Sequence, residues 1–131
     1  MERLFQQPCD PKQLSPLTLA YVGDSVFELF VRERLVCHGN CPVHQLHERS
    51  VAQVRCDAQA KSMEKLMGLL TEEELAVFKR GRNAKTSVPK HASSADYHTA
   101  TGFEALFGYL YLSGRIDRLR QFFQVICPET E

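Results

Sequence analysis

The sequence predicts an all-α protein of about five to seven helices. Apolar residues recur at helical spacing along most of the chain, helix-start and helix-stop residues separate the apolar stretches, and no segment shows the two-residue alternation of a β-strand. The chain has 131 residues, of which 44% are hydrophobic and 24% are charged. This is the composition of a soluble domain that is large enough to bury a core. We therefore expect a single domain over residues 1–131, with loosely ordered tails at 1–13 and 128–131.

Capping residues mark the boundaries of the expected helices. Ser15 followed by Pro16 is a typical helix start, with serine as the N-cap and proline in the first turn. Thr71 and Glu74 have the spacing of a capping box, which opens a short helix that we expect to end at Gly81. Residues 82–95 are polar and poor in apolar anchors, so they predict a loop. The remaining helices are expected at residues 16–36, 43–67, 96–112 and 116–126.

The charge balance excludes a uniformly basic protein. The formal net charge is zero, from 16 Lys and Arg against 16 Asp and Glu. Nucleic-acid binding would therefore require a local concentration of basic residues. The first ten residues lack the apolar run of a signal peptide, and no apolar run approaches the roughly 20 residues that span a bilayer. We expect a cytoplasmic protein with no membrane association.

The cysteines are odd in number and include no Cys-x-x-Cys pair. A zinc site near Cys37 and Cys41, with His44 or His47, is conceivable because Cys and His are the usual zinc ligands, but the spacing matches no common zinc knuckle. We favour reduced thiols in a cytosolic protein. The five residues are Cys9, Cys37, Cys41, Cys56 and Cys127.

Two carboxylates occupy the middle of otherwise apolar helices. On a helical wheel, Asp24 has apolar neighbours on nearly every side of segment 16–36, which indicates a central and buried helix. Glu104 lies in the same way within segment 96–112. An isolated buried carboxylate is costly, so buried acids are paired, neutralised or bound to a metal.

Two interpretations of these acids remain open. Each acid could form a salt bridge with Arg32, Arg34 or Arg55, or lie against a helix dipole. Two converging carboxylates would instead suit a hard divalent cation such as Mg²⁺, which takes oxygen ligands and often uses only one or two protein carboxylates plus waters. Glu28 lies one turn after Asp24 and could join the acids, but we prefer a pair between Glu28 and Arg32.

Segment 79–85, Lys-Arg-Gly-Arg-Asn-Ala-Lys, supplies a local basic concentration, with four cations in seven residues. A solvated helix end with a favourable dipole explains Lys79 and Arg80. It explains less well the cations at 82, 85 and 90, which we expect to lie beyond the helix. Arg and Lys contact phosphates, while Gly and Asn allow close backbone approach. We predict RNA contacts from Arg80, Arg82, Asn83, Lys85 and Lys90.

Three motifs resemble one family. Residues 19–26, Leu-Ala-Tyr-Val-Gly-Asp-Ser-Val, resemble the signature helix of ribonuclease III domains, which has a Gly-Asp-Ser/Ala core. Residues 100–112, Ala-Thr-Gly-Phe-Glu-Ala-Leu-Phe-Gly-Tyr-Leu-Tyr-Leu, resemble a later helix with a Phe/Val-Glu-Ala-Leu-x-Gly core. The basic segment between them points to the mini-ribonuclease III branch, which has the catalytic domain without a double-stranded-RNA-binding domain. The resemblance covers residues 14 to 125, and three motifs in this order are specific.

The resemblance implies an all-helical homodimer that cleaves double-stranded RNA with Mg²⁺, or with Mn²⁺ as a substitute. It implies that Asp24 is the catalytic aspartate and Glu104 the essential metal-binding glutamate, and that both are catalytic metal ligands. It further implies a role in maturing the ends of the 23S (large-subunit) ribosomal RNA precursor in the cytoplasm, with a ribosomal helper protein as a candidate partner.

The sequence departs from the full ribonuclease III pattern at two positions. Ala20 stands where that pattern has an acid four residues before the signature aspartate, and Thr101 stands where it has an acid three residues before the later glutamate. An alternative function is a catalytically inactive ribonuclease III-like protein that binds RNA or the ribosome. Asp24 and Glu104 argue against that alternative, while Ala20 and Thr101 keep it open. A plain helical interaction module would leave the basic segment unexplained.

Overall fold

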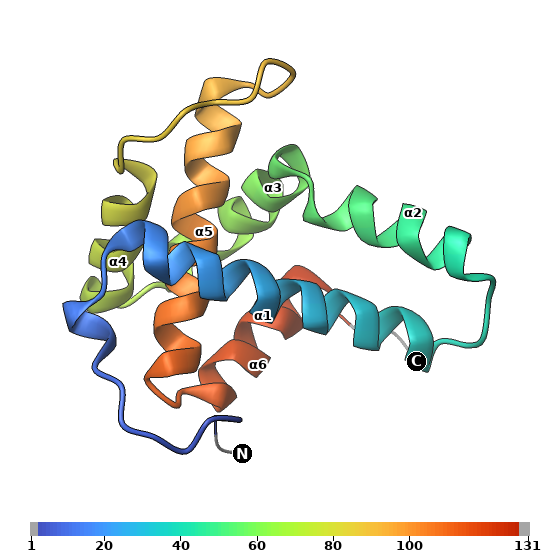
Figure 1. The fold of residues 1–131 in the computed structure, drawn as a ribbon, viewed down its shortest axis with the longest axis horizontal. Helices are drawn as coiled ribbons and strands as arrows, with labels where there is room; N and C mark the ends of the chain where they lie inside the picture. Colours follow the sequence, from blue (N-terminus) through green and yellow to red (C-terminus); the bar gives the residue numbers. More distant parts are fainter. Residues whose placement is uncertain (1–2, 129–131) are drawn as a thin grey trace.

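The computed structural model describes residues 3–128, and within that range it contains helices and no strand, as the sequence predicts (Figure 1). The described residues form six α-helices and two short 3-10 helices. The α-helices are α1 (Pro16–Cys37), α2 (Val43–Val54), α3 (Cys56–Leu66), α4 (Glu72–Arg82), α5 (Ser94–Leu112) and α6 (Ile116–Ile126), and the 3-10 helices are η1 (Pro11–Gln13) and η2 (Met67–Leu69). Residues 1–2 and 129–131, which belong to the expected tails, lie outside the described residues.

Helix α5 is the centre of the fold. Ten of the eleven residues at positions 100–110 are buried, and the exception, Glu104, is half-buried. Helices α1, α3, α4 and α6 all contact α5, and Figure 1 shows α1 lying across it near its midpoint. The prediction that segment 96–112 is a buried helix is confirmed, although the helix begins two residues earlier, after the N-cap Ser93. Helix α5 is therefore the common packing partner of α1, α3, α4 and α6, while α2 packs against α1 and α3.

The prediction that the helix after Pro16 is buried on nearly all sides is wrong. Helix α1 starts as expected, with Ser15 accepting a hydrogen bond from the backbone N–H of Thr18. Its buried side, which includes Leu19, Phe27 and Val31, faces the core. The opposite side is exposed although it carries large apolar side chains. A helical wheel that is apolar on all sides has two explanations. The helix can be buried within its own chain, or it can expose one apolar face that a partner molecule covers.

The expected helix over 43–67 is two helices. Arg55 has an extended backbone (φ −63°, ψ 151°) that ends α2 and precedes α3. Its guanidinium binds the carboxylate of Asp57, which also accepts the backbone N–H of Ala58 in the first turn of α3. The break lets α3 turn toward α5 while α2 stays beside α1. This change of direction places the buried face of α3 against the middle of α5.

Glycines allow α1 and α4 to approach α5 at the level of their backbones. A Cβ atom at Gly23 would lie 1.6 Å from the carbonyl oxygen of Glu104, and one at Gly108 would lie 2.0 Å from that of Leu19. On the other side of α5, a Cβ at Gly81 would lie 2.9 Å from the Cα of Gly102. Gly81 is therefore a buried helix-packing residue and not the end of α4, which continues to Arg82.

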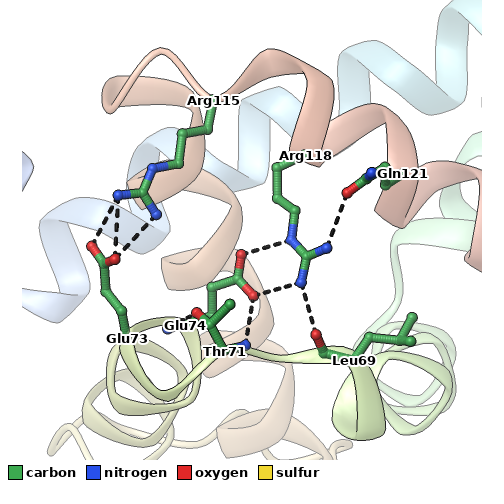
Figure 2. Close-up of polar contacts among 7 residues, drawn as sticks. All are labelled: Leu69, Thr71, Glu73, Glu74, Arg115, Arg118 and Gln121. Carbon is green, nitrogen blue, oxygen red and sulfur yellow. Dashed lines mark hydrogen bonds and ion pairs between the residues drawn. The ribbon is translucent and has the colours of Figure 1, made fainter.

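A buried ion pair ties the start of α4 to α6 (Figure 2). The predicted capping box is confirmed, since Thr71 and Glu74 each accept the backbone N–H of the other. The same Glu74 carboxylate, 2% exposed, accepts two hydrogen bonds of 2.8 Å from Arg118. Burial acts to raise the pKa of Glu74, but Arg118 and the N–H of Thr71 outweigh it, so the pKa lies below its ordinary value. Arg118 also donates to the carbonyl oxygen of Leu69, which completes the connection.

Candidate functional site

Asp24 and Glu104 meet at the crossing of α1 and α5. Their side-chain carboxyl groups are within hydrogen-bonding distance of each other. The close contact of Gly23 with the backbone of Glu104 sets this geometry, because the residue that follows Gly23 is brought beside the side chain of Glu104. The structure thus brings together the two acids that the sequence singled out, although they are 80 residues apart in the chain.

The pair is electrostatically unfavourable without a cation. Burial, the negative charge of Asp24 and the hydrogen bond with Asp24 together raise the pKa of Glu104 to about 8, and a hydrogen bond from Gln59 acts in the opposite direction. Two carboxylates this close cannot both be ionised at neutral pH at low cost. A proton on Glu104 or a cation bound to both groups would relieve this repulsion.

The two acids differ in exposure, which the sequence did not predict. Asp24 is exposed, and Glu104 is half-buried. The expectation that Asp24 lies inside an apolar core is wrong, because it lies next to the solvent-facing side of α1. The site therefore opens to solvent on the side of Asp24, so that a substrate can reach it.

Gln59 is a member of this site that the sequence analysis missed. It lies on α3, is 2% exposed, and its side-chain Nε2 donates to Oε2 of Glu104 across 3.4 Å. Its neighbours on the buried face of α3 are Met63 and Leu66, one and two turns later. A glutamine at a helical spacing otherwise occupied by core residues was the available signal, but the break at Arg55 had to be known to orient α3.

The side chains at positions 20 and 101, where the full ribonuclease III pattern has acids, add no free oxygen ligand to the acid pair. Ala20 is buried and carries no polar atom. Thr101 is also buried, and its hydroxyl donates to the backbone carbonyl of Tyr97 at 3.0 Å. The carboxylate site on α1 and α5 thus consists of Asp24 and Glu104.

The donor set of this site fits a hard divalent cation. Both ligands are carboxylates, and such cations bind with one or two protein carboxylates while waters and substrate oxygens fill the remaining positions. Within residues 3–128 no three His, Cys, Asp or Glu side chains come together as a larger metal site. Two of the arginines considered as salt-bridge partners have other partners: Arg32 binds Glu28, as we preferred, and Arg55 binds Asp57.

The basic segment lies at the end of α4 and in the loop that leads to α5 (Figure 1). Arg80 is exposed, and its guanidinium reaches the carbonyl oxygen of Leu14 at 3.4 Å. Arg82 belongs to the last turn of α4 and not to the loop as expected, and its guanidinium lies over the ring of Phe78 at 5.5 Å. Asn83, Lys85 and Lys90 are exposed in the loop.

The basic segment is attached to the same helix as Glu104. Gly81 packs against Gly102, two residues before Glu104. The packing of glycine on glycine fixes the end of α4, from which the basic segment continues, on α5.

Two further findings concern the cysteines and the possibility of a membrane span. All five cysteines, each within the described range, are free thiols. No helix between residues 3 and 128 combines the length and the apolar character that a membrane span requires.

Comparisons with known proteins identify the family of this chain. The Ribonuclease III domain family matches residues 17–115. A mini-ribonuclease 3 of Symbiobacterium thermophilum is 50% identical over 123 residues, which cover 93% of this chain and 95% of that protein. A mini-ribonuclease 3 of Thermoanaerobacter is 45% identical over 113 residues, which cover 86% of this chain and 80% of that protein.

A solved structure supports the fold independently. The crystal structure of a Fusobacterium nucleatum protein superposes with a TM-score of 0.84 over 92% of this chain and all of the other, at 24% identity. The shared fold, the family match over most of the chain and the mini-ribonuclease 3 relatives lead to one assignment. The chain belongs to the ribonuclease III family, in its mini-ribonuclease 3 branch, and is an endoribonuclease of the ribonuclease III type.

Proposed function

We propose that the protein cleaves double-stranded RNA with Mg²⁺, or Mn²⁺ in its place, held by Asp24 and Glu104. The observation that carries the proposal is the contact between these two carboxyl groups at the crossing of α1 and α5. Carboxyl groups that interact closely enough to raise the pKa of one of them, here Glu104, to about 8 are typical of functional sites. A cation between the two acids would relieve their repulsion.

The roles of the two acids follow from their positions. Glu104 is half-buried and fixed by its neighbours, so it serves as the anchoring ligand. Asp24 is exposed and can bind the cation on the side from which RNA arrives. A divalent cation bound there supplies activation of water and neutralisation of the charge that develops on the scissile phosphate. Both residues are catalytic in this proposal.

The basic segment holds the RNA backbone. A-form RNA is recognised mainly through its shape, its 2′-hydroxyls and its phosphates, so exposed cations on a loop are suitable groups. Lys85 and Lys90 are exposed and can reach phosphates directly. Arg80, Arg82 and Asn83 precede them on the same surface segment, and the glycine contact with α5 fixes that segment relative to the catalytic acids.

The active form in this proposal is a homodimer. The outward side of α1 carries large exposed apolar side chains, which on a soluble protein mark an interaction surface. Tyr21 is 81% exposed and Leu29 is 59% exposed. A second copy that covers this face would give two related sites, one for each strand of a duplex.

We further propose that the substrate is the 23S ribosomal RNA precursor, whose ends the enzyme matures in the cytoplasm with the aid of a ribosomal helper protein. The membership in the mini-ribonuclease 3 branch supports this assignment. The neutral net charge also supports it, because a protein without a general affinity for RNA depends on the shape of its substrate or on a bound partner for selection.

A cleavage assay tests the proposed function. Wild-type protein is incubated with a perfect RNA duplex and Mg²⁺, in parallel with EDTA and with the variants Asp24→Asn and Glu104→Gln. Cleavage is expected in the wild-type reaction alone, and Glu64→Gln, a change at an exposed acid of α3, should cleave normally. Cleavage that survives EDTA or either substitution would overturn the carboxylate mechanism. Binding of the duplex without cleavage under any divalent cation would favour an inactive RNA-binding protein.

A further inference from the structure

The buried side-chain amide of Gln59 lies at the carboxylate site. Gln59 reaches Glu104 from α3, a third helix besides the two that carry the acids. Its Nε2 donates to Oε2 of Glu104, and the side chain is 2% exposed. We propose that Gln59 is a positioning residue, whose amide holds the carboxylate of Glu104 in the orientation in which it and Asp24 bind one divalent cation. This inference rests on the proposed function.

A two-carboxylate site depends strongly on the orientation of each ligand. A carboxylate can rotate about its terminal torsion with little cost, because that torsion has broad minima. Hydrogen bonds from outer residues remove this freedom, and their loss typically lowers metal affinity 10–100-fold. In this chain Ala20 has no polar side-chain atom and the hydroxyl of Thr101 is bound to Tyr97, so neither can orient Glu104. Gln59 provides the amide donor that they do not.

The choice of a neutral donor has a physical reason. A lysine or arginine at this position would neutralise Glu104 and compete with the cation for the same carboxylate. A glutamine N–H stabilises the ionised carboxylate without adding a charge. It therefore prepares Glu104 to act as a ligand and leaves the attraction for a divalent cation in place.

A purely structural role for Gln59 is the competing explanation, since its neighbours on α3 are the core residues Met63 and Leu66. Gln59→Met separates the two, because methionine keeps the length and volume of the side chain but has no N–H donor. Gln59→Asn is a second variant, which keeps the amide but is too short to reach Glu104. Met63→Leu is the matched control, a change of similar size at a buried position of the same helix.

The test measures metal binding in the absence of RNA. Mn²⁺ is titrated into each full-length protein, and free Mn²⁺ is followed by its electron paramagnetic resonance signal, while circular dichroism verifies helix content. We expect the Kd for Mn²⁺ to rise about 10–100-fold in Gln59→Met and in Gln59→Asn and to stay unchanged in Met63→Leu. In cleavage assays the Mg²⁺ concentration for half-maximal rate should rise by the same factor, with the rate restored at saturating Mg²⁺.

The outcomes distinguish this inference from the proposed function. Wild-type protein that binds Mn²⁺ together with Gln59 variants that bind it equally well would overturn the role of Gln59 and leave the metal site intact. A rate that stays low at saturating Mg²⁺ in folded Gln59 variants of normal Mn²⁺ affinity would overturn it as well. Wild-type protein that binds no Mn²⁺ would overturn the proposed metal site and, with it, this role.

Discussion

Gly23 packs directly against the backbone of Glu104, so closely that a Cβ atom at Gly23 would lie 1.6 Å from the carbonyl oxygen of Glu104. The reciprocal contact, from Gly108 to the backbone of Leu19, lies one turn further along α5. Two glycines thus remove the side chains that would otherwise separate α1 from α5. The contact between the carboxyl groups of Asp24 and Glu104 is a consequence of this backbone approach.

Gly23→Ala should therefore damage both the fold and the site. Because the new methyl group meets backbone atoms that cannot rotate away, α1 and α5 must separate, and we expect a loss of about 3 kcal/mol or more in the free energy of unfolding. The measurement is urea unfolding followed by circular dichroism, together with the cleavage rate. Gly68→Ala is the control, since a Cβ at Gly68 meets nothing within 4 Å. Equal stability of the two variants would contradict this account of the crossing.

Features that depend on nearby residues were predicted correctly from the sequence. Ser15 caps α1 and Thr71 caps α4 as expected, because each N-cap hydrogen bond spans only three residues. The acid pair was also identified, since an acid within an apolar helix is conspicuous wherever its partner lies. The ion pair of Glu28 with Arg32 was also predicted correctly, because the two residues are one helical turn apart.

Features that depend on distant residues were missed. The chain leaves the helical path at Arg55 without a glycine or a proline, because α3 gains a packing partner in α5 that α2 does not share. Gln59 could not be assigned to the site until that turn was known. The exposure of Asp24 was mispredicted for a related reason, since an apolar wheel does not reveal which side faces the core.

Glu104→Gln should stabilise the protein in the absence of metal. The folded protein holds a proton on Glu104 up to about pH 8, whereas the unfolded chain releases it near its ordinary pKa of 4.5. A folded pKa above the unfolded one means that stability falls as pH rises between these two values. Glutamine cannot ionise, so in EDTA the melting temperature of the variant should exceed that of the wild type by a margin that grows from pH 5 to pH 8.

Differential scanning calorimetry in EDTA at several pH values checks this expectation. Glu64→Gln, at an exposed acid, serves as the control and should follow the wild-type curve. Addition of Mn²⁺ should raise the melting temperature of the wild type and leave that of Glu104→Gln nearly unchanged. Parallel pH curves for wild type and Glu104→Gln would show that the acids do not repel each other in the folded protein.

Arg118→Met should be among the most destabilising changes outside the core. It removes the two hydrogen bonds that Arg118 donates to the carboxylate of Glu74 (Figure 2). This carboxylate is 2% exposed in the wild type, and in the variant it has no charged partner. Breaking a buried ion pair from one side costs about 3–5 kcal/mol. Arg120→Met removes an exposed pair with Asp117 on the same helix and should cost less than about 1 kcal/mol. Urea denaturation of the two variants makes the comparison, and similar midpoints would refute the importance of the buried pair.

Tyr21→Glu should convert the proposed homodimer into monomers. A charge on the exposed apolar side of α1 would have to be buried without a partner in the dimer, while in a monomer it would remain in water. Light scattering coupled to size-exclusion chromatography measures the mass of each species. Leu69→Glu, at a residue of η2 that is 48% exposed, is the control that should leave the mass unchanged. A wild-type protein that elutes with the mass of one chain would eliminate the dimer from the proposed function.

The double variant Lys85→Ala, Lys90→Ala should weaken RNA binding without slowing the chemical step. Both lysines are exposed in the loop before α5, so their removal costs little stability. Each lost phosphate contact should reduce the slope of log Kd against log salt concentration by about one. Duplex binding is measured in an Asp24→Asn background over a range of salt concentrations, and kcat is measured at saturating RNA. The double variant Lys12→Ala, Lys61→Ala, at two exposed lysines outside the basic segment, is the charge-matched control. If the control lowers the salt slope as much as the loop variants do, the interaction is a general charge effect and the basic segment has no special role in holding RNA.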